Sequence, residues 1–406
     1  MSGREARAGE SVSLSRTDAA RLAWRYQLSP SSLDGAVERL ASVQYDPLSP
    51  MGRNVDLVFQ ARVPGYRVDD WMVTAYRERR LLDAWDKQAS LVTMSDWPAQ
   101  GPFHEWFAER WRGQGLDVDG EEARSLCAEL RELGPATSLD VGDQRSDASR
   151  RGSWYGPKPA RRLLRALWDS GRIVTHHRVA GRHAYAVPER VIPDEVRRRP
   201  ALSAARALER LVERRVQATG LVRPSADASV WFLPCARPER DAAASSLVEQ
   251  GRLIRLNVEG SSWLVLPAAL RALERPELLG VRFLAPLDAL LWDRAAVRDL
   301  HRFDYVWEVY KPVAKRRWGY YVLPVAWGES FVARFDARVQ DGRLVMHSWH
   351  WESDIDPARL PPTLRDDLQV AASEFLAYLG VTEVKLPRGL GRAARSAWLD
   401  SAGERA

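Results

Sequence analysis

Gln44 and Asp46, separated by Tyr45 and followed by Pro47, are the residues whose types and spacing best suit chemistry. Proline disfavours a helical conformation in the residue before it, so Asp46 should be extended. Because alternate residues of an extended segment face the same side, the Gln44 carboxamide and the Asp46 carboxylate should point together, with Tyr45 turned into packing. Such a pair can hold and activate one water molecule. The structural alternative is that Asp-Pro is a common turn after a helix and that Gln is a common helix surface residue.

A helix over residues 32–43 should lead into this motif. Apolar residues recur there at helical spacing, namely Leu33, Val37 and Leu40. Ser31 or Ser32 can cap its start, and we expect it to end near Gln44. An earlier helix is predicted over 15–28, where Ser15 and Asp18 form a start that resembles a capping box. Two short strands, Leu81 to Trp85 and Ser90 to Thr93, follow in the order that is typical of a winged helix-turn-helix.

The composition predicts a soluble globular protein of two to four domains. The chain has 406 residues, of which 45% are hydrophobic and 28% charged. Its polar N-terminus lacks the apolar core of a signal peptide, and no apolar run is long enough to span a bilayer. With only two cysteines, the sequence excludes a four-cysteine metal site. The two lie far apart, so we expect reduced thiols in a cytoplasmic protein. The net charge of +6 suggests a polyanionic partner.

A weak internal repeat organises the middle of the chain. Residues 167–174 resemble residues 247–254, and in both a helix should end at a glycine and be followed by a hairpin with a glycine in its loop. Helix followed by hairpin is the second half of a winged helix, so we predict two further winged-helix units. The alternative is that helix, glycine and strand follow one another in many α+β proteins.

From residue 281 the composition changes to aromatic and β-branched. Four stretches are predicted as strands of an antiparallel sheet or small barrel: Phe303 to Tyr310, Trp318 to Trp327, Ser330 to Val339 and Arg343 to Trp351. The predicted fold class is therefore α+β, with three tandem winged-helix units followed by a small antiparallel β-barrel and C-terminal helices. The boundaries are 1–114 for the unit with the Gln-Tyr-Asp motif, 115–197, 198–280 and 281–406.

Two basic stretches are candidate contacts for nucleic acid. The first gathers cations and aromatic rings in one run, at Lys311, Lys315, Arg316, Arg317 and Trp318. Cations can neutralise phosphates, and rings beside them can stack or wedge. The alternative is a basic loop that leads into a buried aromatic strand. The second stretch, 151–162 with Lys158, stands where a recognition helix would begin, although a solvated cationic loop has the same composition.

The histidines do not predict a metal site. His176 and His177, like His347 and His350, fall in predicted strands without an accompanying cysteine or an HExxH motif. The sequence also lacks a Walker loop, a GxGxxG fingerprint and a GxSxG elbow. We therefore expect no metal and no organic cofactor.

The sequence resembles the winged-helix DNA glycosylases that unhook interstrand crosslinks, the YcaQ-type proteins. The matching stretches are 40–66, 152–190 and 283–336, the last with the runs LAPLDALLWDR and FDYVWEVYKPVAKRRWGYYVLPV. Together they place residues 15 to 390 in the family. The family motif is Gln, an apolar residue, then Gln or Asp, and Gln44-Tyr45-Asp46 is the Asp version. One position departs from the family: Lys87 in Trp85-Asp86-Lys87 stands where relatives carry a histidine.

This resemblance implies three tandem winged helices plus a C-terminal barrel, and a monofunctional hydrolase for N7-alkylated purines and crosslinks. Asp46 would stabilise the sugar cation and activate a water that Gln44 positions, without a cofactor. The partner would be double-stranded DNA bound by a monomer in the cytoplasm, associated with the nucleoid. Arg53 and Lys87 join the predicted DNA contacts, and we expect Lys87 to stay charged because Asp86 is adjacent. The alternative is a non-catalytic winged-helix regulator.

Overall fold

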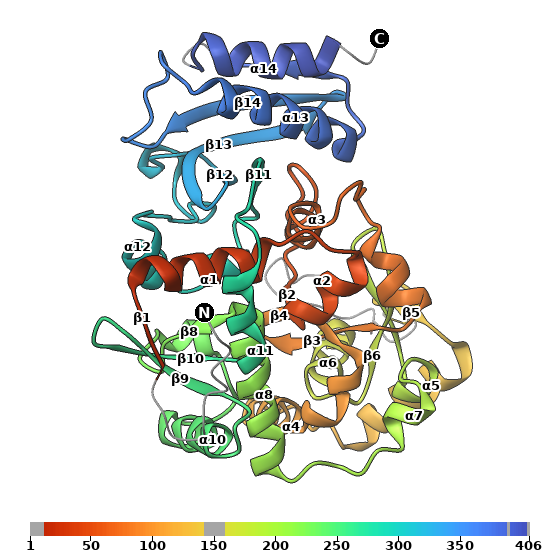
Figure 1. The fold of residues 1–406 in the computed structure, drawn as a ribbon. Coiled ribbons are helices and arrows are strands. Elements are labelled where there is room, and N and C mark those ends of the chain that lie inside the picture. The colour runs from red at the N-terminus through yellow and green to blue at the C-terminus, as the bar shows by residue number, and fades with distance from the viewer. Residues whose placement is uncertain (1–11, 142–158, 388–389, 404–406) are drawn as a thin grey trace. The chain divides into compact units, whose positions relative to one another are not determined.

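The computed structural model describes residues 12–141, 159–387 and 390–403. The chain, coloured by residue number in Figure 1, divides into two compact units. The first comprises residues up to 71, 213–231 and from 245 onward, and the second comprises 72–212 and 232–244. This division is coarser than the four predicted segments, whose boundaries at 114, 197 and 280 remain predictions.

The first unit begins with a capped helix that is buried along two sides. α1 (Arg16–Leu28) starts at Ser15, whose hydroxyl accepts a hydrogen bond from the Asp18 amide at 3.0 Å, as predicted. One side of α1 packs Ala19, Leu22 and Tyr26 against a small sheet, and the other packs Ala23 and Trp24 against residues 278–331. Burial on both sides explains why the polar face of this helix is narrow.

The small sheet under α1 has the strand order β1-β9-β10-β8. β1 (Val12–Leu14) runs parallel to β9 (Ile254–Val258), which forms a hairpin with β10 (Ser261–Val265), and β8 (Leu221–Val222) adds the far edge. α10 (Arg237–Glu249) precedes this hairpin and is followed by Gly251 at φ +70°. The hairpin turn has positive φ at Glu259 and Gly260, as the predicted glycine turn requires.

Asp46 lies after two short elements whose boundary differs from the predicted one. α2 (Leu33–Leu40) begins at Ser32, which accepts a hydrogen bond from the Gly35 amide at 3.2 Å. The predicted helix was to end near Gln44, but α2 ends at Leu40 because Ala41 adopts a left-handed conformation with φ +57°. The next residues form the buried strand β2 (Ser42–Gln44), and α3 (Asn54–Gln60) follows the motif. Burial of the 42–44 strand outweighs the local helical pattern.

A five-stranded sheet forms the C-terminal part of this unit, in the order β11-β12-β13-β14-β15. Its strands are Val281–Phe283, Val322–Trp327, Ser330–Gln340, Arg343–Trp351 and Glu383–Lys385, and only the last pairs in parallel. α13 (Pro362–Leu379) and α14 (Arg392–Gly403) cover one face, where Phe283 contacts Phe375 and Trp398 (Figure 1). Because β11 and β15 are the two edges of the described sheet, a closed barrel is not confirmed.

The segment between β11 and β12 corrects one prediction. Residues 303–310 were expected to form a strand but have no regular structure in the described chain. Their apolar side chains still alternate, because Phe303 and Tyr305 are buried in the core beside α1. The same unit also holds α9, α11 and α12, at Ala228–Trp231, Pro267–Leu270 and Arg294–His301.

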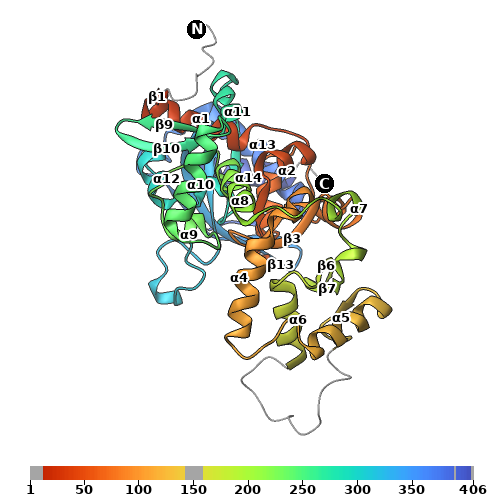
Figure 2. The same cartoon turned by 90° about the horizontal axis from the view of Figure 1, so that it is seen from below.

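The second unit contains two β-hairpins and a helical layer. β3 (Leu81–Asp86) and β4 (Gln88–Thr93) form the first hairpin, as predicted, and β6 (Val174–Val179) and β7 (Arg182–Ala186) form the second, with β5 (Ala136–Thr137) at its edge. α4 (Gly101–Arg112), α5 (Glu121–Leu133) and α6 (Pro159–Asp169) share one apolar core, and α4 lies beside α6 (Figure 2).

The predicted repeat is confirmed in its local geometry. α6 is followed by Gly171 at φ +71°, matching Gly251 after α10, and both following hairpins turn through a glycine with positive φ. α7 (Asp194–Arg197) and α8 (Ala204–Thr219) follow the second hairpin. None of the described helices combines the length and hydropathy needed to cross a membrane.

Candidate active site

The Gln44 side chain is buried and its acceptor oxygen is unsatisfied. Gln44 is 8% exposed, and its backbone carbonyl accepts a hydrogen bond from Asn54 Nδ2 at 2.8 Å. Its side-chain Oε1 has no hydrogen-bond partner among the described residues. Tyr45 points into packing as predicted, since it is buried and its ring meets that of Trp71 edge-on at 6.1 Å. Buried polar atoms almost always have a partner, so Oε1 marks a place for a bound water or substrate.

Asp46 is half-buried, and its side chain forms a turn with the residues that follow it. Its Oδ1 accepts a hydrogen bond from the Leu48 amide at 2.9 Å, a side-chain turn that steers the chain around Pro47. Burial raises the pKa of Asp46 above its usual range, and the Leu48 amide partly offsets that rise. The carboxylate is therefore a stronger base than a solvated aspartate, which suits a group that must accept a proton.

The loop after Asp46 is held by the C-terminal sheet and its helix. The Val339 amide of β13 donates to the Pro50 carbonyl at 2.8 Å, and the Tyr378 hydroxyl of α13 donates to the Met51 carbonyl at 3.1 Å. Gly52 has φ +85°, and a Cβ there would lie 1.8 Å from the Tyr378 hydroxyl, so no larger residue fits. Residues more than 280 positions apart in sequence thus fix the path of the motif loop.

Arg53 is engaged by carboxylates and not presented as a free cation. Its guanidinium pairs with Asp69 and lies 3.7 Å from the buried Asp56. Asp56 also accepts hydrogen bonds from the Tyr66 hydroxyl at 3.0 Å and from the amides of Asp69 and Arg53 at 2.8 and 3.1 Å. Arg53 was predicted to contact DNA; the structure places it in this cluster, which holds the loop and the start of α3 together.

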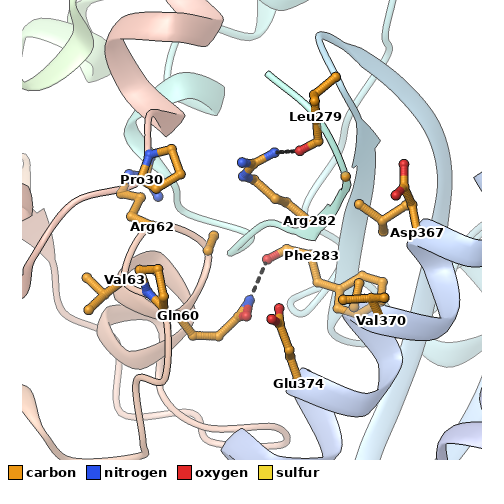
Figure 3. Close-up of a pocket in the computed structure, with 15 residues that line it drawn as sticks. Pro30, Gln60, Arg62, Val63, Leu279, Arg282, Phe283, Asp367, Val370 and Glu374 are labelled. Atoms are coloured by element: carbon orange, nitrogen blue, oxygen red, sulfur yellow. Dashed lines mark hydrogen bonds between the residues drawn. The ribbon is translucent and has the colours of Figure 1, made fainter. Parts of the chain in front are cut away.

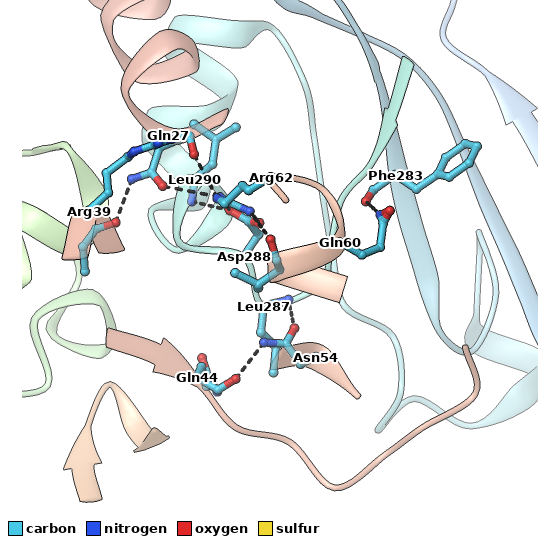
Figure 4. A network of polar contacts seen from close by, with 12 residues as sticks. Gln27, Arg39, Gln44, Asn54, Gln60, Arg62, Phe283, Leu287, Asp288 and Leu290 are labelled. Carbon is cyan, nitrogen blue, oxygen red and sulfur yellow. Dashed lines mark hydrogen bonds and ion pairs between the residues drawn. The ribbon is translucent and has the colours of Figure 1, made fainter. Parts of the chain in front are cut away.

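Asn54 and Arg62, at the two ends of α3, connect this helix to residues 283–290 (Figure 4). Asn54 is fully buried, and while its Nδ2 holds Gln44, its Oδ1 accepts from the Leu287 amide at 3.0 Å. Arg62 makes two parallel hydrogen bonds to the buried Asp288, at 2.7 and 2.8 Å. Such a bidentate pair fixes geometry as well as charge, so the element that carries Gln44 is rigidly tied to the C-terminal part of the same unit.

Lys87 belongs to the second unit, at the turn between β3 and β4. Its side chain is half-buried, and its carbonyl accepts a hydrogen bond from the Ser90 hydroxyl at 3.2 Å. Its neighbour Trp85 stacks on Phe107 at 4.6 Å and donates from its indole to Asp169 at 2.9 Å. Lys87 thus sits at the tip of a well-anchored hairpin, the position expected of a wing. The other predicted contact, Lys158, lies outside the described residues.

The basic stretch 308–319 is folded around one buried carboxylate. Glu308, 1% exposed at its side chain, accepts from the amides of Arg317 and Trp318 at 2.9 and 2.7 Å and from Lys311 Nζ at 2.9 Å. Burial alone would raise the pKa of Glu308, but these hydrogen bonds outweigh it and lower that pKa to about 2. The buried Glu308 carboxylate therefore holds this loop in place through these hydrogen bonds.

The basic side chains of this loop lie mostly at the surface. Lys311, Lys315 and Arg317 are exposed, and Arg316 donates to the Lys311 carbonyl at 2.9 Å while its guanidinium covers Tyr320. Arg317 lies 4.2 Å above the Trp318 ring, whose other contacts are Arg334 and His350. Trp318 is half-buried against the core, while Lys311, Lys315 and Arg317 are exposed, and the contact of this stretch with DNA stays a prediction.

The histidines behave as structural residues. Burial, followed by the charge of Arg79, lowers the pKa of His176 to about 4, and His350 packs against Trp318. Within the described ranges no cluster of three or more His, Cys, Asp or Glu side chains could hold a metal ion.

A pocket in the same unit lies apart from the motif (Figure 3). Gln60 and the residues after α3 form one wall, β11 with Arg282 the second, and Asp367, Val370 and Glu374 of α13 the third. Neither Gln44 nor Asp46 lines it. Gln60 and Arg282 donate across its floor to backbone carbonyls, at 3.0 and 2.8 Å, so its polar groups already support the sheet.

Comparison with known proteins identifies the family. The family model for AlkZ-like DNA glycosylases matches residues 37–378, most of the chain. The chain belongs to the AlkZ-like DNA glycosylase family. The Streptomyces sahachiroi DNA glycosylase AlkZ has a similar α+β fold, with a TM-score of 0.61 at 16% sequence identity, over 93% of this chain and 100% of that one. The protein is thus a DNA glycosylase, an enzyme of DNA repair.

Several residues that shape the site of this glycosylase were missed by sequence reasoning. Asn54 and Tyr378 contact distant segments, and Asp56 bonds Tyr66 and Asp69, which lie 10 and 13 positions further along the chain. No local pattern reveals these contacts. Glu308 stands in the matching stretch 283–336, three residues before Lys311, and an acid beside a basic run is the signal that could have identified it.

Proposed function

We propose that this glycosylase hydrolyses the N-glycosidic bond of N7-alkylated purines in duplex DNA and thereby also unhooks interstrand crosslinks. Gln44 and Asp46 carry the reaction. The observation that supports this most is the buried, unsatisfied Oε1 of Gln44 two residues from an aspartate whose pKa is raised by burial. An acceptor without a partner beside a base is what a site for a nucleophilic water requires.

The proposed reaction needs no general acid, because an N7-alkylated purine is already cationic. The bond between sugar C1′ and purine nitrogen breaks, and its electron pair leaves with the base, which becomes neutral. Positive charge develops on the sugar, as in other glycoside hydrolyses, and the Asp46 carboxylate stabilises it. The water oxygen then bonds to C1′ and its proton passes to Asp46, while Gln44 Oε1 holds the water through its second hydrogen.

In this proposal, basic residues of two surfaces hold the DNA. The DNA phosphates are contacted by Lys311, Lys315, Arg316 and Arg317. The Trp318 ring packs against the Arg317 guanidinium. Lys87 contacts a phosphate at the tip of the first hairpin, and Lys158 remains a predicted contact. Arg53 positions the motif loop through Asp69 and Asp56. A base tied to the opposite strand cannot swing out freely into a deep pocket, which agrees with a motif that lies outside the pocket of Figure 3.

The architecture expected with this function is three tandem winged-helix units and a C-terminal barrel, acting as a monomer at the nucleoid. The three hairpins β3–β4, β6–β7 and β9–β10, each preceded by helices, support the three units. The half-open five-stranded sheet supports a barrel-like C-terminal domain.

One gel experiment separates the glycosylase from a non-catalytic winged-helix regulator. A labelled duplex with a single N7-methylguanine is incubated with the protein and then with mild alkali, which cuts at abasic sites. The proposal predicts an alkali-dependent cut at the lesion that Asp46→Asn does not produce. A duplex bound without any cut would favour the regulator. A crosslinked duplex that separates into single strands on a denaturing gel tests the unhooking step.

A further inference from the structure

The pocket of Figure 3 is lined by two opposite charges that do not pair with each other. Its volume is about 190 Å³, and all the residues that line it belong to the first unit. Arg282 of β11 stands on one wall and Glu374 of α13 on another. Within the described part of the chain neither side chain forms an ion pair. The proposed hydrolysis at Gln44 and Asp46 leaves this pair of charges unexplained.

Arg282 brings hydrogen-bond donors into the pocket. Its Nη1 donates to the Leu279 carbonyl at 2.8 Å, which fixes the guanidinium but uses only one of its N–H groups. Burial, followed by the charge of Arg62, lowers the pKa of Arg282, while the charge of Glu374 raises it. Arg62 is already paired with Asp288. A guanidinium of fixed direction is the group best suited to bind two acceptors of a planar ligand at once.

Glu374 brings acceptors to the same pocket. It is exposed, and its side chain points from α13 toward Gln60 and Phe283 (Figure 3). The second acid of the pocket, Asp367, already accepts a hydrogen bond from Trp327 Nε1 at 2.8 Å. Gln60 is engaged as well, because its Nε2 donates to the Phe283 carbonyl at 3.0 Å. Among the described acids of the pocket, Glu374 therefore has both carboxylate oxygens available for a ligand.

The remaining walls are largely apolar. Pro30, Val63 and Pro64 line one side, and Val370 and Ala371 of α13 line another. Ligand sites typically combine apolar walls with a small number of polar groups that fix the orientation of the ligand. A volume of about 190 Å³ corresponds to about six water molecules at the density of the liquid. The pocket therefore suits one small ring system and not a larger ligand.

A ligand that satisfies both charges must carry acceptors at one edge and donors at the opposite edge. Guanine has this arrangement: O6 and N7 are the acceptors that an arginine binds in pairs, and N1–H and the N2 amino group are donors that a carboxylate can accept. Adenine has the reverse polarity, since its N6 amino group would face Arg282 and its N1 acceptor would face Glu374. The chemistry of the two side chains therefore selects guanine among the purines.

We propose that this pocket binds an unpaired guanine base, with Arg282 donating to O6 and N7 and Glu374 accepting from N1 and N2. The same edge chemistry is offered by a free guanine nucleotide and by an extrahelical guanine of DNA. The inference goes beyond the proposed hydrolysis and does not depend on it, because neither Gln44 nor Asp46 lines the pocket.

Isothermal titration with GMP, AMP and 7-methyl-GMP tests the reading of the base edges. AMP should bind about 100-fold more weakly than GMP or not at all, because both pairs of hydrogen bonds are lost. 7-Methyl-GMP should bind about 10-fold more weakly than GMP, because the methyl group removes one of the two acceptors of Arg282. Equal affinity for GMP and AMP would overturn the proposal, as would binding of L-arginine in place of GMP, since that zwitterion could also bridge the two charges.

Glu374→Gln is the sharpest variant, because it keeps the size of an exposed side chain that makes no hydrogen bond among the described residues. Affinity for GMP should fall about 10-fold to 100-fold. Glu383→Gln is the matched control, since Glu383 is an exposed acid of β15, at the opposite edge of the same sheet. It should leave GMP binding unchanged. Arg282→Lys keeps the positive charge without the two parallel donors, so it should lose the preference for GMP over AMP.

Duplexes with a single bulged guanine or a single bulged adenine separate the two sources of the base. A tighter Kd for the bulged guanine by fluorescence anisotropy, lost in Glu374→Gln, identifies an extrahelical guanine of DNA. GMP binding without that preference identifies the free nucleotide. If GMP does not bind and the two duplexes bind equally, the pocket is not a guanine site. That result would leave the proposed hydrolysis standing, which fails only if Asp46→Asn remains fully active.

Discussion

Asn54 holds Gln44 to the C-terminal part of the same unit: its Nδ2 donates to the Gln44 carbonyl at 2.8 Å, and its Oδ1 accepts from the Leu287 amide at 3.0 Å. One fully buried amide side chain thus uses both its ends to set where Gln44 lies. The strand that carries Gln44 is placed by a residue ten positions later in sequence and by a segment more than 240 positions away.

Asn54→Ala should therefore lower both stability and activity. It leaves the Gln44 carbonyl and the Leu287 amide buried without partners, at a cost of about 1–3 kcal/mol for each such group. Urea unfolding measures the loss of stability, and single-turnover kinetics measures the loss of rate. Asn257→Ala, which removes an exposed side chain that caps the β9–β10 turn, is the control and should change the rate little. An Asn54→Ala protein with wild-type stability would show that the bridge contributes nothing.

Asp46→Asn should be more stable than the wild type at neutral pH. Because burial raises the pKa of Asp46 in the folded state, the folded chain binds a proton more readily than the unfolded chain. Stability from this group is present at low pH and falls as pH rises from the unfolded to the folded pKa. The uncharged carboxamide that replaces the carboxylate avoids that loss and can still accept from the Leu48 amide.

Melting temperatures across pH check this sign. The variant should melt higher than the wild type at neutral pH, and the difference should vanish below the usual pKa of aspartate. A lower melting temperature for the variant at neutral pH would mean that the Asp46 charge stabilises the fold.

Removing two cations from the loop ordered by Glu308 should weaken binding to damaged and undamaged DNA alike. Lys315 and Arg317 are the best pair to change, because Lys311 and Arg316 also bond within the loop. Each lost phosphate contact reduces the slope of log K against log salt by about 0.9, so the pair should reduce it by about 1.8. Affinity is measured by fluorescence anisotropy at several salt concentrations.

The control for this pair is Lys385→Ala with Arg359→Ala, two exposed cations elsewhere in the same unit. That double variant should retain the wild-type slope. Equal slopes for both double variants would assign the loop a structural role alone.

Lys87 should leave the abasic product intact. A neutral lysine near the sugar could form a Schiff base and cut the strand after base loss, but we expect Lys87 to stay charged and to bind a phosphate. Borohydride should therefore trap no covalent adduct between protein and DNA. A trapped adduct that disappears in Lys87→Ala would show a bifunctional enzyme. Lys87→Ala should otherwise weaken DNA binding while the chemical step continues.

Local features of the fold were predictable because they depend on neighbouring residues. Ser15 and Ser32 cap the helices they precede. Gly171 and Gly251 follow the matching helices α6 and α10 and have left-handed backbones. Hairpins at residues 328 and 341–342 follow from turn residues in the same way.

Long-range contacts explain what the sequence could not reveal. α2 stops at Leu40 because the 42–44 strand is buried, and residues 303–310 stay irregular although they alternate, because their apolar side chains fill a core completed by α1. The DNA contact of Arg53 stays a prediction, and its pairing with Asp69, 16 positions away, was not predictable from the local sequence. The common facing of Gln44 and Asp46 stays a prediction, while the support that Asn54 and Tyr378 give to the motif could not be predicted from the sequence.

The central claim is that Gln44 and Asp46 perform the hydrolysis. The most direct test is the single-turnover rate of N7-methylguanine release by Asp46→Asn and Gln44→Ala, measured beside the Kd of each variant for the same duplex. The account predicts that Asp46→Asn lowers the rate by about 1,000-fold or more and that its Kd stays equal or becomes tighter, because a negative charge near phosphate is removed. Gln44→Ala should lose rate without losing affinity. A near-wild-type rate for Asp46→Asn would contradict the account.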